Sequence, residues 1–266
     1  MRRSTAPSIA VCALAAALLL AGCGGSTHGG RRAGGELVLQ PVADQGPDPF
    51  TDSTATSTAT PPPATRTQQS APAAGESAAL SVLRSLSGGT PGLYGGTERV
   101  GSCDVERQIG QLTADRRKAR AFARVAGVSP DSLPDHLRAL TPVVLRNDTR
   151  VTNHAFRDGR ATGYQSVLQA GTAVLVDNRG VPRVRCACGN PLKPPVETKD
   201  DGGTRGRPWP GYRPGEVIVV TPAPEVITSL TIVNAVNKNW IERRTGHDAH
   251  HDYVVPPPVW ATGSLS

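Results

Sequence analysis

A long low-complexity stretch near the N-terminus limits how much of this 266-residue chain can fold. Glycine pairs begin at positions 24, 29 and 34, and residues 51–63 consist almost wholly of Thr, Ser, Ala and Pro. Such a segment buries too little apolar surface to offset the conformational entropy lost on folding. We therefore predict a flexible tether over residues 23–87, a single folded domain over 88–255 and a flexible tail over 256–266.

The first 22 residues have the composition of an export signal. Arg2 and Arg3 give a positive start, and residues 9–20 form an apolar run. The run is shorter than the roughly 20 residues that a membrane-spanning helix needs. We predict a signal peptide over residues 1–22 that is removed after export, which is favoured over a permanent membrane span.

The apolar run ends in Leu20-Ala21-Gly22-Cys23, which resembles the lipobox of bacterial lipoproteins. The resemblance implies cleavage before Cys23 and attachment of a diacylglycerol to its thiol, because stable anchoring takes more than one acyl chain. No later segment is long and apolar enough to span a bilayer. The expected location is the outer face of the cytoplasmic membrane, with the lipid as anchor.

The chain carries a formal net charge of +7, which drops when Arg2 and Arg3 leave with the signal. Basic charge often indicates nucleic-acid binding, but an exported domain rarely meets nucleic acid. Arg far outnumbers Lys, and this bias, with abundant Ala, Gly and Pro, is typical of a GC-rich genome. The expected partners are the membrane, through the lipid, and a cell-wall polymer or envelope protein.

Two helices are predicted at the start of the folded domain. Apolar residues recur with a 3.6-residue period over 105–126, Ser102 or Asp104 can cap the start, and Gly127 stands where a C′ residue belongs. Ser129-Pro130 opens a second, shorter helix that reaches Leu140.

After residue 140 the pattern changes to short β-branched runs between turn residues. Strands are expected over 142–145, 166–168, 172–176, 181–186, 216–221 and 230–233, with a hairpin turn at 177–180. The Pro- and Gly-rich stretches 191–195 and 202–215 are expected to be loops. The predicted fold class is α+β, with N-terminal helices packed on a mainly antiparallel sheet.

The predicted domain contains three cysteines, Cys103, Cys186 and Cys188, an odd number in an oxidising compartment. Cys186 and Cys188 are too close along one strand to bond each other without strain. We predict that Cys103 bonds to one of them, which closes a loop of about 85 residues and contributes roughly 3–4 kcal/mol. The remaining cysteine is then a buried or a reactive thiol.

Two further interpretations of the cysteines stay open. The three thiols could hold zinc together with His154, although the spacing matches no closed zinc pattern. A catalytic cysteine could instead act with His154 and with Asp148 or Asp158. A structural disulfide is favoured over both, so no catalytic residue, metal site or cofactor is predicted.

A histidine-rich segment lies near the C-terminus, where His247, His250 and His251 alternate with Asp248 and Asp252. Such a cluster can bind a transition metal loosely. A solvated and poorly ordered segment is the favoured interpretation.

The loop predicted over residues 147–160 is the first candidate for a binding surface, because it is polar and rich in arginine. Its candidate residues are Asn147, Asp148, Arg150, Asn153, His154 and Arg157. The alternative is that its Asn and Asp side chains simply build turns through bonds to the backbone.

Three stretches resemble an uncharacterised domain found in lipoproteins of high-GC Gram-positive, actinobacterial-type organisms. They are TPVVLRNDTRVTNHAFRDGRAT at 141–162, VLQAGTAVLVD at 167–177 and GVPRVRCACGNPL at 180–192. Residues 93–97 (LYGGT), Cys103-Asp104 and 209–212 (WPGY) fit the same resemblance. The family is also seen at the extracellular end of some serine/threonine kinases. The resemblance implies no assigned activity and no catalytic residues.

The leading functional hypothesis is a membrane-anchored, non-enzymatic binding or sensory module at the cell envelope. It depends on the predicted anchor and tether and on the absence of a recognisable catalytic motif. One alternative is an exported thiol enzyme that uses Cys186 or Cys188. Another is a purely structural envelope protein.

Overall fold

The computed structural model describes residues 36–56, 84–196 and 203–262, all within one compact unit, Ala33–Ser266. The predicted signal peptide 1–22, the lipidation residue Cys23, residues 57–83 of the predicted tether and the last four residues lie outside this part. The corresponding predictions are therefore not tested by the structure.

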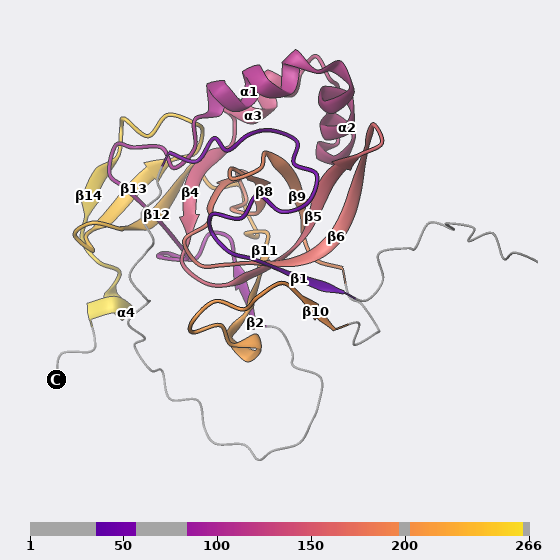
Figure 1. The fold of residues 1–266 in the computed structure, drawn as a ribbon. Coiled ribbons are helices and arrows are strands. Elements are labelled where there is room, and N and C mark those ends of the chain that lie inside the picture. The colour runs from indigo at the N-terminus through magenta and orange to yellow at the C-terminus, as the bar shows by residue number, and fades with distance from the viewer. Residues whose placement is uncertain (1–35, 57–83, 197–202, 263–266) are drawn as a thin grey trace, which may run out of the picture. The chain divides into compact units, whose positions relative to one another are not determined.

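Fourteen strands form one large mixed sheet (Figure 1). The main path runs β10-β1-β6-β5-β9-β8-β7-β4-β3-β12-β13-β14, and β11 pairs with β2 and β5 beside it. The strands are β1 Leu37–Gln40, β2 Arg84–Ser87, β3 Tyr94–Gly96, β4 Thr141–Leu145, β5 Thr149–Arg157, β6 Arg160–Leu168, β7 Ala173–Val176, β8 Pro182–Arg185, β9 Asn190–Lys193, β10 Thr204–Arg205, β11 Ile218–Thr221, β12 Ser229–Asn234, β13 Trp240–Arg244 and β14 Tyr253–Val255.

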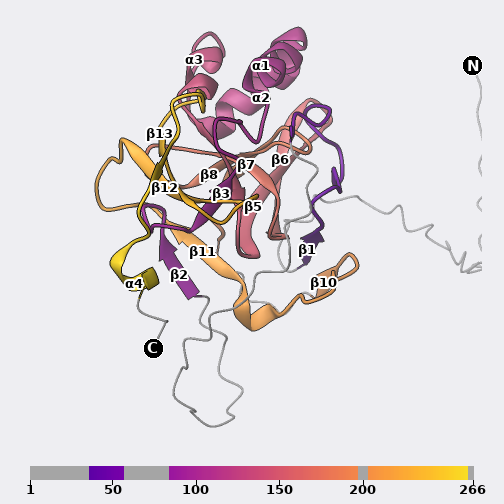
Figure 2. The same ribbon diagram turned by 90° about the vertical axis from the view of Figure 1, so that its left-hand side faces the viewer.

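The helices are short, and α2 packs against β6 and β9. Figures 1 and 2 show α1, α2 and α3 grouped together and α4 at the opposite end. They are α1 Val105–Ala114, α2 Arg116–Ala126, α3 Leu133–Arg138 and α4 Val259–Thr262, with a 3₁₀ turn η1 at Pro214–Glu216. No helix in the described ranges is long and apolar enough to cross a bilayer.

The predicted fold class is therefore wrong. The structure is mostly sheet, and the sheet is mixed because β1 pairs in parallel with β6 and β10, β11 with β2 and β5, and β12 with β3. The prediction failed because several strands come from segments without β-branched runs, including the predicted tether. The strands expected near 142–145, 172–176, 181–186, 216–221 and 230–233 are present as β4, β7, β8, β11 and β12.

The first predicted helix is broken in two at Asp115. Asp104 caps α1 as expected, because its Oδ1 accepts from the backbone N–H of Arg107 at 2.9 Å. Asp115 has extended backbone angles and caps α2 by accepting from Arg117 and Lys118. Gly127 ends α2 in the left-handed conformation, with φ 78°.

The predicted loop over 147–160 is instead the first strand of a long hairpin. β5 and β6 pair antiparallel from Thr149↔Leu168 to Arg157↔Arg160, and Asp158-Gly159 makes the turn with φ of 51° and 74°. The strand went unrecognised because one of its inward-facing residues, Asn153, is polar.

Residues 36–56 belong to the folded domain, although their composition predicted tether. β1 pairs with β6, and its Leu39 packs with Val167 and Val217. Phe50 is fully buried and meets Phe122 edge-on at 5.8 Å between ring centroids. One strand and one aromatic anchor therefore offset the weak apolar content of this segment.

Candidate binding site

The six residues of the predicted binding loop do not form one site, because side chains alternate along β5. Arg157 lies at the hairpin end, where its Nε donates to Asp48 Oδ2 at 2.8 Å. The backbone N–H of Phe156 also donates to the Asp48 carbonyl at 2.7 Å. These bonds fasten residues 41–49, which we call the β1 loop, to the hairpin.

His154 has a structural partner. Its Nδ1 lies 3.0 Å from the carbonyl oxygen of Pro191, and burial is the largest cause of a lowered pKa for its imidazole. The ring is therefore neutral near pH 7 and held against β9.

Asp148, the residue before β5, makes a second set of contacts. Its Oδ1 accepts from the Ala170 N–H at 2.8 Å, and its Oδ2 accepts from Trp209 Nε1 at 3.1 Å. Burial raises the pKa of this carboxyl, an effect that the two hydrogen bonds oppose. Trp209 in turn packs on Tyr212, with 5.0 Å between the ring centroids. Asp148 therefore fastens the WPGY loop to the sheet.

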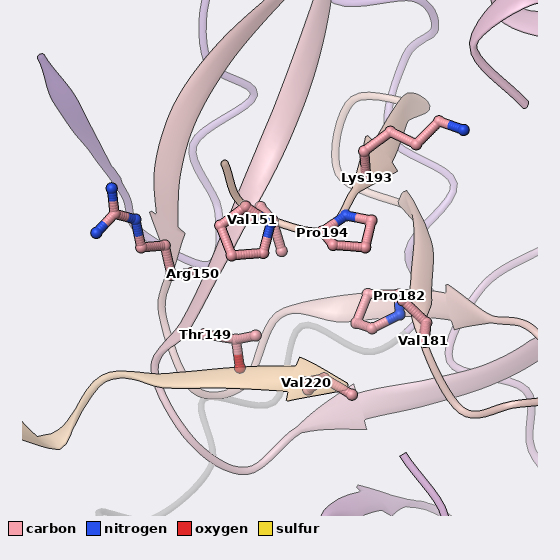
Figure 3. A pocket seen from close by; sticks show the side chains of 9 residues that line it. Thr149, Arg150, Val151, Val181, Pro182, Lys193, Pro194 and Val220 are labelled. Carbon is pink, nitrogen blue, oxygen red and sulfur yellow. The ribbon is translucent and has the colours of Figure 1, made fainter. Parts of the chain in front are cut away.

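Arg150 borders a small hole between β5, the segment 181–182, the end of β9 and β11 (Figure 3). Its volume is about 10 Å³, which is room for about one water molecule. Figure 3 shows the charged ends of Arg150 and Lys193 pointing away from it. Neighbouring Asn147 contributes a turn, in which its carbonyl accepts from Thr149 Oγ1 at 2.8 Å. This hole is too small for a ligand.

Asn153 points inward and joins the most unusual feature of the interior. Its Nδ2 donates to Gln40 Oε1 at 2.6 Å, and Gln40 Nε2 donates to the Tyr164 hydroxyl at 3.3 Å. Burial raises the pKa of Tyr164 far above its usual value, so the phenol stays protonated. We call the connected set the buried polar cluster; its members are Gln40, Asn153, Tyr164, Arg185, Cys188 and Asn190.

Arg185 brings a full charge into this cluster. Its side chain is 0% exposed, its Nη2 donates to the Pro41 carbonyl at 2.8 Å, and its Nη1 lies 3.8 Å from Cys188 Sγ. Burial raises the pKa of the Cys188 thiol, although Arg185 opposes this, so the sulfur is neutral near pH 7. Among the described residues no carboxylate forms an ion pair with Arg185.

Several polar atoms of the cluster lack a hydrogen-bond partner in the described part of the chain. They are Asn153 Oδ1, Arg185 Nε and Asn190 Nδ2, and Ser166 Oγ on the same strand as Tyr164 is a fourth. Each belongs to a residue that is 0% exposed. Buried polar groups are almost always satisfied, so atoms like these require water or a ligand.

The sequence indicated Asn153 only as a binding-loop residue and Cys188 only as a disulfide or thiol candidate, and it did not indicate Gln40, Tyr164, Arg185 or Asn190. Arginine is almost never fully buried, so nothing in its identity indicated this position. The one signal near the cluster in the sequence was the glycine at position 189. The structure shows why a glycine stands there: its φ is 63°, and a Cβ would collide with the Thr51 side chain. A position that only glycine can occupy indicates that the backbone packs closely against a neighbouring side chain there.

The cysteine prediction is confirmed, and the structure selects the pair. Cys103 bonds to Cys186, with 5.9 Å between the Cα atoms, and Cys188 is free and buried. The described ranges hold no group of three or more potential metal-ligating side chains, so nothing there supports zinc. The catalytic interpretation gains no support either, because the free thiol is neutral and the His154 imidazole contacts Pro191.

The C-terminal histidines are exposed, as the favoured interpretation expected. His251 Nδ1 lies 3.2 Å from Asp248 Oδ2 at the surface. Asp252 is instead buried, where it pairs with Arg243 at 2.5 Å. The histidines and Asp252 therefore do not share a site.

Comparison with known proteins gives one match. The sequence pattern of a family described as a domain of unknown function, DUF6777, matches residues 84–246. No curated protein and no solved structure matches the chain significantly. The matched segment contains Asn153, Tyr164, Arg185, Cys188 and Asn190, whereas Gln40 and β1 lie before it.

Proposed function

Because the chain belongs to the DUF6777 family of domains of unknown function, we propose its function from its own residues. The protein is an exported lipoprotein of actinobacterial type, attached through Cys23 to the outer face of the cytoplasmic membrane. Its folded domain is a non-enzymatic binding module that holds a small anionic group at Arg185. The resemblance to domains at the extracellular end of serine/threonine kinases supports a sensory role.

One observation carries the binding proposal: Arg185 is a fully buried cation without an acidic partner among the described residues. A buried charge is expensive unless it is paired and hydrogen-bonded. A carboxylate or phosphate oxygen would supply the missing charge and accept from Nε, and a guanidinium suits such groups because of its planar fork of donors. The amide of Asn190 offers a second unpartnered donor, at Nδ2.

The β1 loop is the proposed entrance. Its Pro41 carbonyl accepts from Arg185, and Gly46 lies against the amide of Gln40. The loop is fastened by the exposed ion pair of Arg157 with Asp48, a kind of contact worth at most about 1 kcal/mol, and by hydrogen bonds from the Phe156 N–H to the Asp48 carbonyl and from the Val42 N–H to Gln169 Oε1. Opening this loop would uncover the cluster without separating the strands of the sheet.

Thermal unfolding in a panel of small anions tests the binding proposal. Phosphate, sulfate and acetate are each compared with chloride at constant ionic strength. An anion at one hundred times its Kd stabilises the folded state by about 2.7 kcal/mol. Arg185→Met should abolish this stabilisation, and Arg185→Lys, which keeps the charge but loses Nε, should weaken it.

Arg243→Met is the matched control, because Arg243 is also 0% exposed but is paired with Asp252. This variant should be less stable and yet keep the full response to the anion. If no anion stabilises the wild-type protein more than chloride does, the binding proposal is wrong. A response that survives Arg185→Met would place the site elsewhere.

The anchor is tested separately by cell fractionation. The full chain should enter the membrane fraction and incorporate a labelled fatty acid, and Cys23→Ala should abolish the label. A wild-type chain that stays soluble and unlabelled would overturn the anchor while leaving the binding proposal intact.

A further inference from the structure

Large apolar side chains are exposed together near the C-terminus. Val259 is 89% exposed, Trp260 64%, Tyr253 53% and Val254 50%. These are four of the eight exposed large hydrophobic residues in the described part of the chain, and they lie within eight consecutive positions. Clustered exposure of this kind marks an interaction surface. Val254 faces the other side of β14, opposite Ile241, so we call Trp240, Tyr253, Val259 and Trp260 the C-terminal apolar patch.

The patch is built on the sheet. β14 pairs with β13, so that Tyr253 lies opposite Glu242 and Val255 opposite Trp240. Trp260 of α4 meets Trp240 edge-on, with 5.7 Å between the ring centroids. Trp240 lies against the backbone of Gly92, where a Cβ would come within 2.7 Å of the ring. Figure 1 shows α4 beside the end of the sheet formed by β12, β13 and β14.

The proposed anchor keeps the patch within reach of the bilayer. The first strand that the structure describes begins at Leu37, fourteen residues after Cys23. Fourteen residues span at most about 50 Å even when fully extended. A domain on so short a connection meets the lipid surface at a high effective concentration.

We propose that the C-terminal apolar patch docks onto the outer surface of the membrane, with Val259 and Trp260 entering the level of the lipid head groups. This docking surface is additional to the proposed lipid anchor, and the proposal rests on that anchor only for proximity. Trp and Tyr favour the membrane–water interface, where an amphipathic ring meets both phases. Arg244, exposed on the same strand β13 as Trp240, supplies a cation for anionic head groups.

The composition of the patch favours lipid over a glycan. A glycan stacks on open aromatic faces and hydrogen-bonds to polar groups beside them. Here Trp240 is packed against Gly92 and Trp260, and the carboxylate of Glu242 is already held by the Ser229 and Thr231 hydroxyls. The exposed Val259 offers a glycan no polar contact, whereas aliphatic groups gain by leaving water for a membrane.

Vesicle co-sedimentation of the mature chain, residues 23–266, carrying Cys23→Ala tests the proposal without any contribution from the lipid or from the apolar export signal. Vesicles of phosphatidylcholine alone and with phosphatidylglycerol are compared. The chain should sediment with vesicles, more strongly when they are anionic, and its tryptophan emission should shift to shorter wavelength. Val259→Asp and Trp260→Ser should each weaken binding at least about tenfold. Val226→Asp is the matched control, because Val226 is 58% exposed but lies outside the patch, and it should bind like the parent.

Three outcomes would overturn the proposal. The first is no vesicle binding by the Cys23→Ala chain. The second is retention on purified cell-wall polymer without binding to vesicles, which would identify a glycan surface. The third is a dimer that Val259→Asp dissociates and that does not bind vesicles, which would identify a second copy of the chain as partner. Because the chain tested has no lipid, each result is independent of whether Cys23 is lipidated.

Discussion

The guanidinium of Arg243 and the carboxylate of Asp252 form an ion pair that solvent does not reach. Nη2 lies 2.5 Å from Oδ2, and the two side chains are 0% and 1% exposed. Arg243 also donates to the carbonyls of Pro142 and Thr97, at 2.6 and 2.8 Å. Arg185 is equally buried, and no acid in the described part of the chain pairs with it. The two residues thus provide an internal comparison of a paired and an unpaired buried arginine.

Removing one partner of the Arg243–Asp252 pair should be strongly destabilising. Arg243→Met leaves the Asp252 carboxylate buried without its cation, a change that typically lowers the free energy of unfolding by about 3–5 kcal/mol. Urea denaturation monitored by circular dichroism measures the loss. The double variant Arg243→Met/Asp252→Leu should recover much of it, because no charge is then left unpaired. A loss below about 1 kcal/mol in the single variant would contradict this account.

The Cys103–Cys186 disulfide should contribute to stability through the length of chain it closes. The two residues are 83 positions apart, for which the chain-entropy model gives about 4.5 kcal/mol, more than the roughly 3–4 kcal/mol expected from the sequence. The double variant Cys103→Ala/Cys186→Ala should lose about this much in denaturant unfolding. Peptide mass spectrometry of the unreduced protein should recover the Cys103–Cys186 pair. A bond from Cys103 to Cys188 would show that the structure has the wrong partner.

Cys188 should be a slow thiol in the native protein. Its sulfur is fully buried, and burial raises its pKa, so the reactive thiolate is scarce near neutral pH. Iodoacetamide at pH 8 should label it far more slowly in buffer than in urea. Cys188→Ala supplies the blank for the assay. Rapid labelling of the folded protein would instead favour the thiol-enzyme alternative.

Asp148 should make the stability and the fluorescence of the protein depend on pH in the acidic range. Burial raises its folded-state pKa above the usual value of 3.8, so the folded protein binds this proton more tightly than the unfolded chain does. The contribution of this group to the free energy of unfolding is therefore greatest at low pH. It falls as pH rises through 3.8 and up to the folded-state pKa, and it is constant above that.

Trp209 reports the same titration, because its indole N–H donates to Asp148. Its emission should change with a midpoint above pH 3.8, and Asp148→Asn should remove the transition. Trp209→Phe identifies the signal among the three tryptophans of the chain. A midpoint below 3.8 would mean that the hydrogen bonds to the carboxylate outweigh its burial.

Local signals in the sequence predicted local structure well. The caps at Asp104 and Gly127 are present, and the turn at 177–180 joins β7 to β8. These features depend on side-chain-to-backbone bonds and on glycine geometry within a few residues, so a single sequence contains them. The break at Asp115 was missed because the apolar stripe continues across it, although an aspartate in that position is a good N-cap.

Features that depend on distant partners were not predictable. β1 forms because Leu39 pairs and packs with Val167, which lies more than one hundred positions later in the chain. Asn153 was expected in a loop, and its burial depends on a hydrogen bond to Gln40, which is distant in the sequence. Arginine is rarely fully buried, and Arg185 is buried because of its contacts with Pro41 and Cys188. The fold class was wrong for the same reason, because strand pairing across the sheet is set by contacts that no window of the sequence contains.

The early strand β1 sets a practical boundary for anyone who shortens this protein. The family match begins at residue 84, yet β6 lies between β5 and β1 in the sheet. A fragment cut at the start of the match would lose β1, so β6 from Ser166 to Leu168 would be unpaired on the side away from β5 and Val167 would be uncovered. An unpaired sheet edge with apolar side chains is a template for self-association. Such a fragment should precipitate or form oligomers on expression, whereas one that starts before Leu37 should stay monodisperse.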